Sequence, residues 1–184
     1  AQLLVVGTQS KRAVSRWILG SVSEKAIRIC SCDVLVARGV GPQEGYSRIL
    51  VPTDFSDVSA KALDAAVELA APKGAIDFLH AWGLPGATPS FWGGAGQELQ
   101  KSVVSNAEES ASSRIAKHSE FAGSIEFVLQ EGDPRKAIED QTKAQTYQLI
   151  SMGTHGREGI NRLLLGSVAE WVLRNIDVSV YLVR

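Results

Sequence analysis

The stretch from Leu149 to Arg184 reads LISMGTHGREGINRLLLGSVAEWVLRNIDVSVYLVR, and it aligns without a gap onto Leu3 to Arg38, LLVVGTQSKRAVSRWILGSVSEKAIRICSCDVLVAR. The offset between the two stretches is constant at 146 residues, and roughly a third of the aligned positions are identical. Self-similarity at a fixed offset is the signature of a repeated structural unit. The 184 residues therefore contain the closing piece of one copy and a complete second copy.

This repeat divides the chain into three parts. We expect residues 1–39 to be the last strand, helix and edge strand of a first copy, residues 40–46 to be a linker, and residues 47–184 to be the second copy. The linker is rich in Gly and Pro, which is typical of a boundary. Because the chain begins with Ala1 in the middle of the first copy, we expect it to be a piece of a longer tandem protein.

Strands and helices are predicted to alternate along residues 47–184. Short apolar runs typical of buried strands are followed by segments of helical periodicity. The predicted strands are Arg48–Asp54, Ile76–Trp82, Ser124–Gln130, Tyr147–Met152 and Val178–Val183. The predicted helices begin at Ser56 or Asp57, at Gln97 (ending at His118), at Gly132–Pro134 and at Ser167 (ending at Asn175), and Gly83–Gly96 is predicted to be a long Gly/Pro-rich excursion. This order indicates a doubly wound α/β fold with a parallel sheet covered on both faces.

Composition excludes several classes of function. The chain has 19 Lys and Arg against 20 Asp and Glu, so it lacks the basic surplus that binds nucleic acid or an acidic membrane without specificity. No apolar run approaches the roughly 18–20 residues of a membrane span, and we expect a soluble cytoplasmic protein. Cys30 and Cys32 would project from the same face of a strand and are expected to be reduced thiols. The three histidines lie far apart, so no structural metal is predicted.

A candidate phosphate site follows the fourth predicted strand of the second copy. Gly153 and Gly156 permit positive φ and let an anion approach the backbone, because they have no Cβ. The chain returns nine residues later at Gly166 and Ser167, where a new helix presents free N–H groups and a hydroxyl. In doubly wound sheets ligands bind at the carboxyl ends of the strands, which is where these residues fall.

These residues also resemble a known family. Residues 153–174, GTHGREGINRLLLGSVAEWVLR, are similar to the G-x2-G-x9-G-[ST] signature of the universal stress protein family, and Ile49–Ser56 resembles that family's first strand and turn. The resemblance implies a flavodoxin-like five-stranded sheet of order 3-2-1-4-5, ATP binding, and dimerisation through the fifth strands. It therefore implies that residues 34–37 pair antiparallel with residues 178–183, within one chain or between two chains.

The resemblance also implies roles for single residues. Asp54 would contact the adenine or ribose, Ala81 and Met152 would form an apolar wall, and Arg157 would reach the terminal phosphates. The residues that would wrap the ribose and phosphates are Gly153, Gly156, Gly166, Ser167 and Val168. Magnesium could be carried on the phosphates with help from Ser167. The first copy has Ser10 in place of the second glycine, and we expect it to bind no nucleotide.

Three classes of function remain open at this point. The leading hypothesis is an ATP-binding stress or regulatory module with little or no turnover, because no G-x4-G-K-[ST] loop and no pair of acidic residues for two-metal catalysis is present. A slow ATPase or phosphotransfer enzyme on the same fold is the first alternative. The second is a ligand-free dimerisation module, which the intact glycine motif disfavours.

Overall fold

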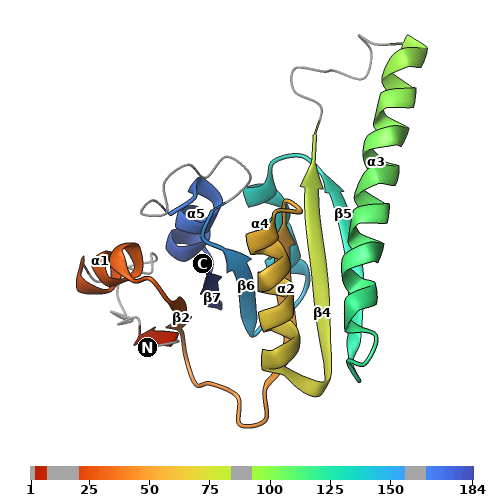
Figure 1. The fold of residues 1–184 in the computed structure, drawn as a ribbon. Coiled ribbons are helices and arrows are strands. Elements are labelled where there is room, and N and C mark those ends of the chain that lie inside the picture. The colour runs from red at the N-terminus through yellow and green to blue at the C-terminus, as the bar shows by residue number, and fades with distance from the viewer. Residues whose placement is uncertain (1–2, 8–20, 84–92, 156–164) are drawn as a thin grey trace.

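The structure is a computed structural model, and it describes residues 3–7, 21–83, 93–155 and 165–184. In these ranges seven strands form one mixed sheet of order β1-β2-β7-β6-β3-β4-β5 (Figure 1). The strands are β1 (Leu3–Gly7), β2 (Asp33–Ala37), β3 (Tyr46–Thr53), β4 (Ala70–Trp82), β5 (Ser124–Glu131), β6 (Leu149–Gly153) and β7 (Ser179–Val183). The α-helices are α1 (Ser21–Ile29), α2 (Asp57–Leu69), α3 (Gly93–Ile115), α4 (Pro134–Ala144) and α5 (Ser167–Asn175).

The five strands of the second copy have the predicted order. Counted from β3 as strand 1, the sheet runs 3-2-1-4-5 from β5 to β7, and all four pairings are parallel. The prediction of a doubly wound α/β fold is confirmed. The structure adds that β1 and β2 continue the same sheet, so the N-terminal piece is no separate body.

Helices cover both faces of the sheet, and each face has its own apolar core. On one face α2 and α3 pack on the sheet through Ala62, Leu63, Ala66 and Ala111. On the other, α4 and α5 pack through Ala137, Ile138, Ala169, Val172 and Leu173. Strand residues alternate between the two cores, as Ile49, Leu50 and Val51 do, because successive side chains of a strand point to opposite faces.

Local sequence signals fix several helix ends. Ser56 is the N-cap of α2, and its side chain accepts a hydrogen bond from Ser59 N. Asp133 caps α4 in the same way, with Pro134 at the first helical position as predicted. The long polar helix predicted from Gln97 to His118 is also found. It begins earlier, at Gly93, and after α3 ends at Ile115 a 3₁₀ turn, Ala116–His118, continues it.

Two predicted boundaries are wrong by several residues, while β3 and β6 differ from their predicted bounds by one or two. Residues 93–96 belong to the predicted excursion Gly83–Gly96 but form the first turn of α3, while residues 84–92 lie outside the described residues. β4 begins at Ala70, directly after α2, and runs through Pro72 and Gly74, because Tyr46 of β3 already pairs with Ala70. No helix in the described ranges is both long enough and apolar enough to cross a membrane.

The repeat is visible in the element boundaries. β1, α1 and β2 have the same bounds as β6, α5 and β7 once the offset of 146 residues is applied. β2 pairs antiparallel with β7 through Val34 with Leu182, Leu35 with Tyr181, and Val36 with Val180. The predicted pairing of these two strands is confirmed, and in the structure it joins them within one chain. Leu35 and Tyr181 occupy equivalent positions, so an approximate twofold axis passes between them.

Side chains across this seam obey the same symmetry. Arg38 donates from Nη2 to the carbonyl oxygen of Leu173 at 2.6 Å, and Arg184 donates to the carbonyl oxygen of Ile27. Arg184 is the equivalent of Arg38, and Leu173 is the equivalent of Ile27. Each arginine therefore reaches over the axis to the same carbonyl of the other copy, which is the reciprocity of an isologous interface.

Helices α1 and α5 add a symmetric group of four charges. Arg28 lies 3.5 Å from a carboxylate oxygen of Glu170, and Arg174 lies 3.2 Å from one of Glu24. Each arginine also pairs with the glutamate of its own helix at i,i+4. Because these groups are partly exposed, each pair adds little stability, but together they orient the two helices against each other.

Candidate functional site

The predicted site residues follow the carboxyl ends of neighbouring strands. Asp54 comes directly after β3, Ala81 lies at the end of β4, and Gly153 ends β6. Since β3 lies between β4 and β6 in a parallel sheet, these three positions lie along one edge. The beginning of α5 joins the same edge, because Gly166 N donates to the carbonyl oxygen of Thr154 at 2.7 Å.

Asp54 forms a tight turn with the cap of α2. Its Oδ1 accepts from Ser56 N at 3.0 Å and from Ser56 Oγ at 2.6 Å. The backbone is then redirected at Phe55, which has φ of 61°, a left-handed conformation that costs energy for a side chain other than glycine. The structural role of a turn residue is thus present at Asp54, whatever else it contacts.

Phe55 is held in this conformation by partners on three sides. Its N–H donates to Thr53 Oγ1 at 2.9 Å, and its carbonyl accepts from Arg114 Nη2 of α3 at 2.6 Å. The Arg114 guanidinium also lies over the Phe55 ring, with Cζ 5.2 Å from the ring centroid. The centroids of the Phe55 and His80 rings are 4.5 Å apart. Sequence reasoning missed this arrangement, because a positive φ at phenylalanine has no local signal.

An apolar wall lies beneath the edge on the side of α4 and α5. Met152 is buried there, and Ala81 and Val168 are half-buried residues packed against the same core cluster. Val128 and Leu165 belong to the same group. Ala81 and Met152, the two apolar residues that the family resemblance implied, thus belong to one core cluster, and Met152 at 4% exposure contributes mainly to that core.

Thr154 connects the ends of two strands and the start of α5. Its N–H and its hydroxyl both donate to the carbonyl oxygen of Val183, at 2.9 Å and 3.0 Å, and its own carbonyl accepts from Gly166. The residue is 1% exposed. Sequence analysis assigned it no role, although its identity with Thr8 in the repeat was the signal that could have singled it out.

His155 has one ring nitrogen without a partner among the described residues. The Thr154 hydroxyl donates its hydrogen to the carbonyl oxygen of Val183. In its contact with His155 Nδ1, at 2.8 Å, Thr154 Oγ1 is therefore the acceptor. Nε2 is then a bare acceptor, and it is buried with no hydrogen-bond partner in the part of the chain that the structure describes. A ligand that carries a hydroxyl group would satisfy it.

The glycines of the motif have a packing role that the sequence did not indicate. Gly153 does not adopt the positive φ that its missing Cβ would permit. A Cβ at position 153 would lie 2.9 Å from Val58 Cγ1 of α2 and 3.2 Å from the carbonyl oxygen of His155. At Gly166, where φ is −61°, a Cβ would meet the Thr154 carbonyl oxygen at 3.1 Å. Both glycines therefore let chain segments approach closely.

The N-terminus of α5 carries no side-chain cap. Gly166 is the N-cap residue, and the first intrahelical bond runs from Glu170 N to Gly166 O. The N–H groups of Ser167 and Val168 precede that bond, and the Ser167 side chain is exposed. Such a terminus attracts an anion through its free N–H groups and its dipole. The other two members of the predicted phosphate loop, Gly156 and Arg157, lie outside the described residues.

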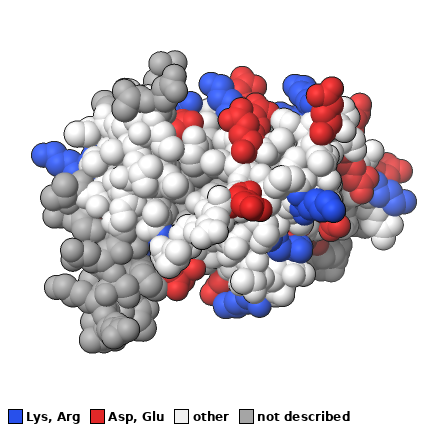
Figure 2. Space-filling view, turned by 90° about the horizontal axis from the view of Figure 1, so that it is seen from below, with Lys and Arg blue, Asp and Glu red and all other residues white. Residues whose placement is uncertain are grey.

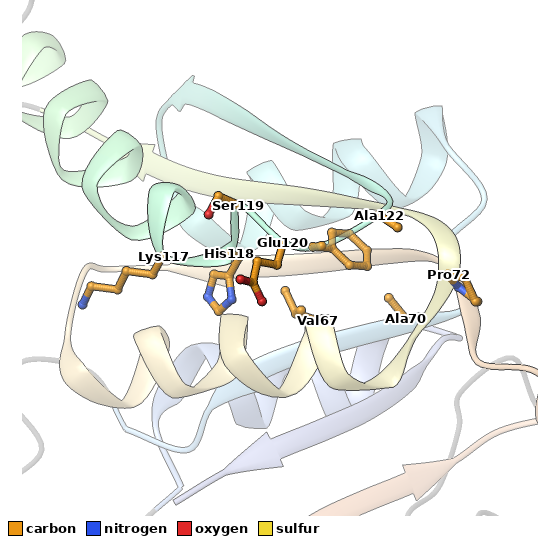
Figure 3. Close-up of a pocket in the computed structure, with 9 residues that line it drawn as sticks. Val67, Ala70, Pro72, Lys117, His118, Ser119, Glu120 and Ala122 are labelled. Atoms are coloured by element: carbon orange, nitrogen blue, oxygen red, sulfur yellow. The ribbon is translucent and has the colours of Figure 1, made fainter.

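A groove of about 560 Å³ lies at the other end of the sheet. It is lined by Val67 and Ala70 at the end of α2 and by residues 117–122, which precede β5, and His118 and Glu120 face into it (Figure 3). None of the predicted site residues lines this groove. His118 Nε2 lies 3.1 Å from Asp64 Oδ1, which ties the end of α3 to α2.

Charge is mixed on the face below the strands. Figure 2 views this face, and Lys, Arg, Asp and Glu side chains are interspersed on it without a broad area of one sign. This agrees with the formal net charge of −1 for the whole chain. Among the described residues, no three His, Cys, Asp or Glu side chains are grouped as metal ligands would be.

A doubly wound α/β sheet with its candidate site beyond the carboxyl edge defines the class of protein. The model of the universal stress protein family matches residues 1–38 and 45–184. The chain therefore belongs to the universal stress protein family, as its motif suggested.

Known relatives agree with this assignment. A universal stress protein of Mycobacterium tuberculosis is 31% identical over 197 residues, covering 100% of this chain and 62% of the relative. YxiE, a universal stress protein of Bacillus subtilis, is 30% identical over 154 residues, covering 76% of this chain and 99% of the relative. The chain thus spans about 62% of the length of its mycobacterial relative.

Solved structures share the fold. A universal stress protein of Archaeoglobus fulgidus matches 100% of this chain and 62% of its own, with a TM-score of 0.67 and 21% identity. A universal stress protein solved in complex with cAMP matches 76% of this chain and 98% of its own, with a TM-score of 0.54 and 26% identity.

Proposed function

We propose that this chain binds an adenine nucleotide, with ATP as the leading candidate, at the carboxyl edge of the sheet. Through this binding it acts as a nucleotide-dependent stress or regulatory module. The observation that carries the proposal is the meeting of an uncapped helix N-terminus, an apolar wall and an acidic turn at one edge. The relative solved with cAMP supports the adenine class of ligand.

Each part of the nucleotide has a matching group. Ala81 and Met152 would contact the base and Asp54 the ribose or base. The helix terminus at Ser167 and Val168, together with Gly153 and Gly166, would wrap the ribose and phosphates. The bare Nε2 of His155 suits a ribose hydroxyl as donor. Gly156 and Arg157 complete the proposal as phosphate ligands, and Mg²⁺, where present, would be carried on the phosphates near Ser167.

The proposed role is binding with little or no turnover. The described part of the site offers one carboxylate, Asp54, and its Oδ1 is already engaged by Ser56. Two-metal phosphoryl transfer needs a pair of acidic ligands, and P-loop chemistry needs a lysine on the phosphates. A steady-state phosphate release above about 1 per second, the lower end of ordinary enzymes, would overturn this part of the proposal.

The proposed position of the phosphates has a sharp test in Ser167→Asp. A carboxylate in the first turn of α5 favours the helix but repels phosphates, so we expect unchanged or higher stability with ATP affinity reduced at least about tenfold. The matched control is Ser21→Asp, the equivalent position in α1, for which we expect wild-type affinity. Equilibrium dialysis with labelled ATP measures both. Wild-type affinity in Ser167→Asp would refute the phosphate position, and no binding of ATP or cAMP by the wild-type chain would refute the function.

We also propose the tandem organisation: a first-copy piece at 1–39, a linker at 40–46 and a complete domain at 47–184. The equal element bounds at an offset of 146 residues and the two matched ranges of the family model support it. The reciprocal contacts of Arg38 and Arg184 would then be the interface of two domains.

A further inference from the structure

Cys30 and Cys32 do not lie on a strand. Cys30 N donates to the carbonyl oxygen of Ala26 at 2.9 Å, which closes the last turn of α1, and the chain bends at Ser31 and Cys32 before β2 begins at Asp33. The bend turns the two side chains toward each other. Their sulfur atoms are 2.8 Å apart and share a hydrogen bond, and both cysteines are free. The expectation of two thiols side by side on a strand is therefore wrong.

The bend is held in place by the end of β7. Asp33, the residue after Cys32, accepts from Tyr181 OH and from Arg184 N, each at 3.1 Å. Arg184 also donates to the carbonyl oxygen of Ile27 in the last turn of α1. Both flanks of the cysteine pair are thus tied to the C-terminal residues of the second copy. The pairing of the sulfur atoms is a consequence of the tertiary structure and not of the dipeptide spacing alone.

The two cysteines are partly exposed. Both are half-buried, and Ser31 between them is exposed. Cys30 has its inner side against the apolar core, while the pair as a whole lies at the surface beside the seam. Neither cysteine is enclosed in the core, and both keep part of their surface exposed in the folded chain.

We propose that Cys30 and Cys32 form a reversible thiol–disulfide site that is oxidised by low-molecular-weight disulfides of the glutathione type. One thiolate attacks a sulfur of the reagent, forms a mixed disulfide and releases one reduced thiol. The second cysteine loses its proton, attacks the protein sulfur of the mixed disulfide and releases the other thiol. Two protein thiols are oxidised, one reagent disulfide is reduced, and one intramolecular S–S bond is formed.

Cys30 is the attacking residue in this sequence. The hydrogen bond from Cys32 lowers the pKa of the Cys30 thiol, and the positive charge of Arg184 acts in the same direction. The same hydrogen bond raises the pKa of Cys32, which suits it to the second step. This division of roles follows the general rule that the thiolate is the nucleophile and the neighbouring cysteine resolves the mixed disulfide.

The test uses the full chain, oxidised glutathione, and acid quenching followed by mass spectrometry. Trypsin releases both cysteines on one peptide, Ile29–Arg38, because cleavage follows Arg28 and Arg38. We expect this peptide to lose two hydrogen atoms in wild type and in the control Ser31→Ala, and to recover them with reduced glutathione. Cys32→Ser is expected to stop at a single glutathione adduct on Cys30, and Cys30→Ser to react at least about tenfold more slowly.

Several results would overturn the proposal. Stable glutathione adducts on both cysteines of wild type would show that the intramolecular disulfide does not form. Disulfide-linked dimers on a non-reducing gel would show that the thiols react between chains. Equal rates for the two single variants would remove the assigned order of attack. Circular dichroism of each variant controls for folding.

Discussion

Gly153→Ala separates packing from ligand binding at the centre of the motif. The new Cβ would stand 2.9 Å from Val58 Cγ1, closer than side chains tolerate, so the Val58 side chain, α2 or β6 must shift. Overpacking of this kind costs about 1–3 kcal/mol of unfolding free energy. Gly7 is the repeat equivalent of Gly153, and a Cβ there meets nothing within 4 Å. Gly7→Ala is therefore the matched control and should stay within about 0.5 kcal/mol of wild type.

Urea unfolding, followed by tryptophan fluorescence, measures these free energies. The deciding comparison is the cost of Gly153→Ala in wild type and in a chain that also carries Val58→Ala. Removing the two Val58 methyl groups clears the shortest contact and leaves the one of 3.2 Å to the His155 carbonyl oxygen. Gly153→Ala should therefore cost about 1 kcal/mol or more in wild type and clearly less beside Val58→Ala. An equal cost in both backgrounds would refute the packing argument. The ATP affinity of the double variant then tests the ligand role. A tenfold loss of affinity, about 1.4 kcal/mol, would show that nucleotide binding also requires a residue without a Cβ at position 153.

Other predictions concern stability, pH and the linker. Tyr147→Phe removes the hydroxyl that donates to the buried Asp77 carboxylate, which also pairs with Arg48 at 2.8 Å; we expect a loss of about 1.5–3 kcal/mol in urea unfolding, and a smaller one for the half-buried Tyr181→Phe. The hydrogen bonds from Arg135 lower the pKa of Asp133 to about 2, against 3.8 ordinarily. The stabilisation from this charge is therefore complete above the ordinary pKa and disappears as the pH falls through about 2. Asp133→Asn should be less stable than wild type at neutral pH and equal to it at the acid end; a constant difference would contradict this. Because residues 39–44 are exposed, glutamyl endopeptidase should cut after Glu44, and the fragments should co-elute under native conditions through the β2–β7 pairing; separate elution would show that the seam is weak.

Much of the fold follows from local patterns in the sequence. The bounds of α5, Ser167–Asn175, match the prediction, because apolar periodicity acts over a few residues. The order of the five strands also agrees with the family resemblance. The boundary at Ala70 was missed, since pairing of β4 with Tyr46 outweighs the local effect of Pro72 and Gly74. The start of α3 at Gly93 was also missed.

The sequence by itself determined the repeat, the alternation of strands and helices, and the positions of the residues at the carboxyl edge. Only the tertiary structure decided that Gly153 packs against Val58, that Thr154 joins β6, β7 and α5, and that the sulfur atoms of Cys30 and Cys32 meet. The physical reason is range. Periodicity and caps are set by neighbours a few positions apart, whereas these contacts depend on segments that the sheet brings together. The chain separation reaches 157 residues, between Ile27 and Arg184.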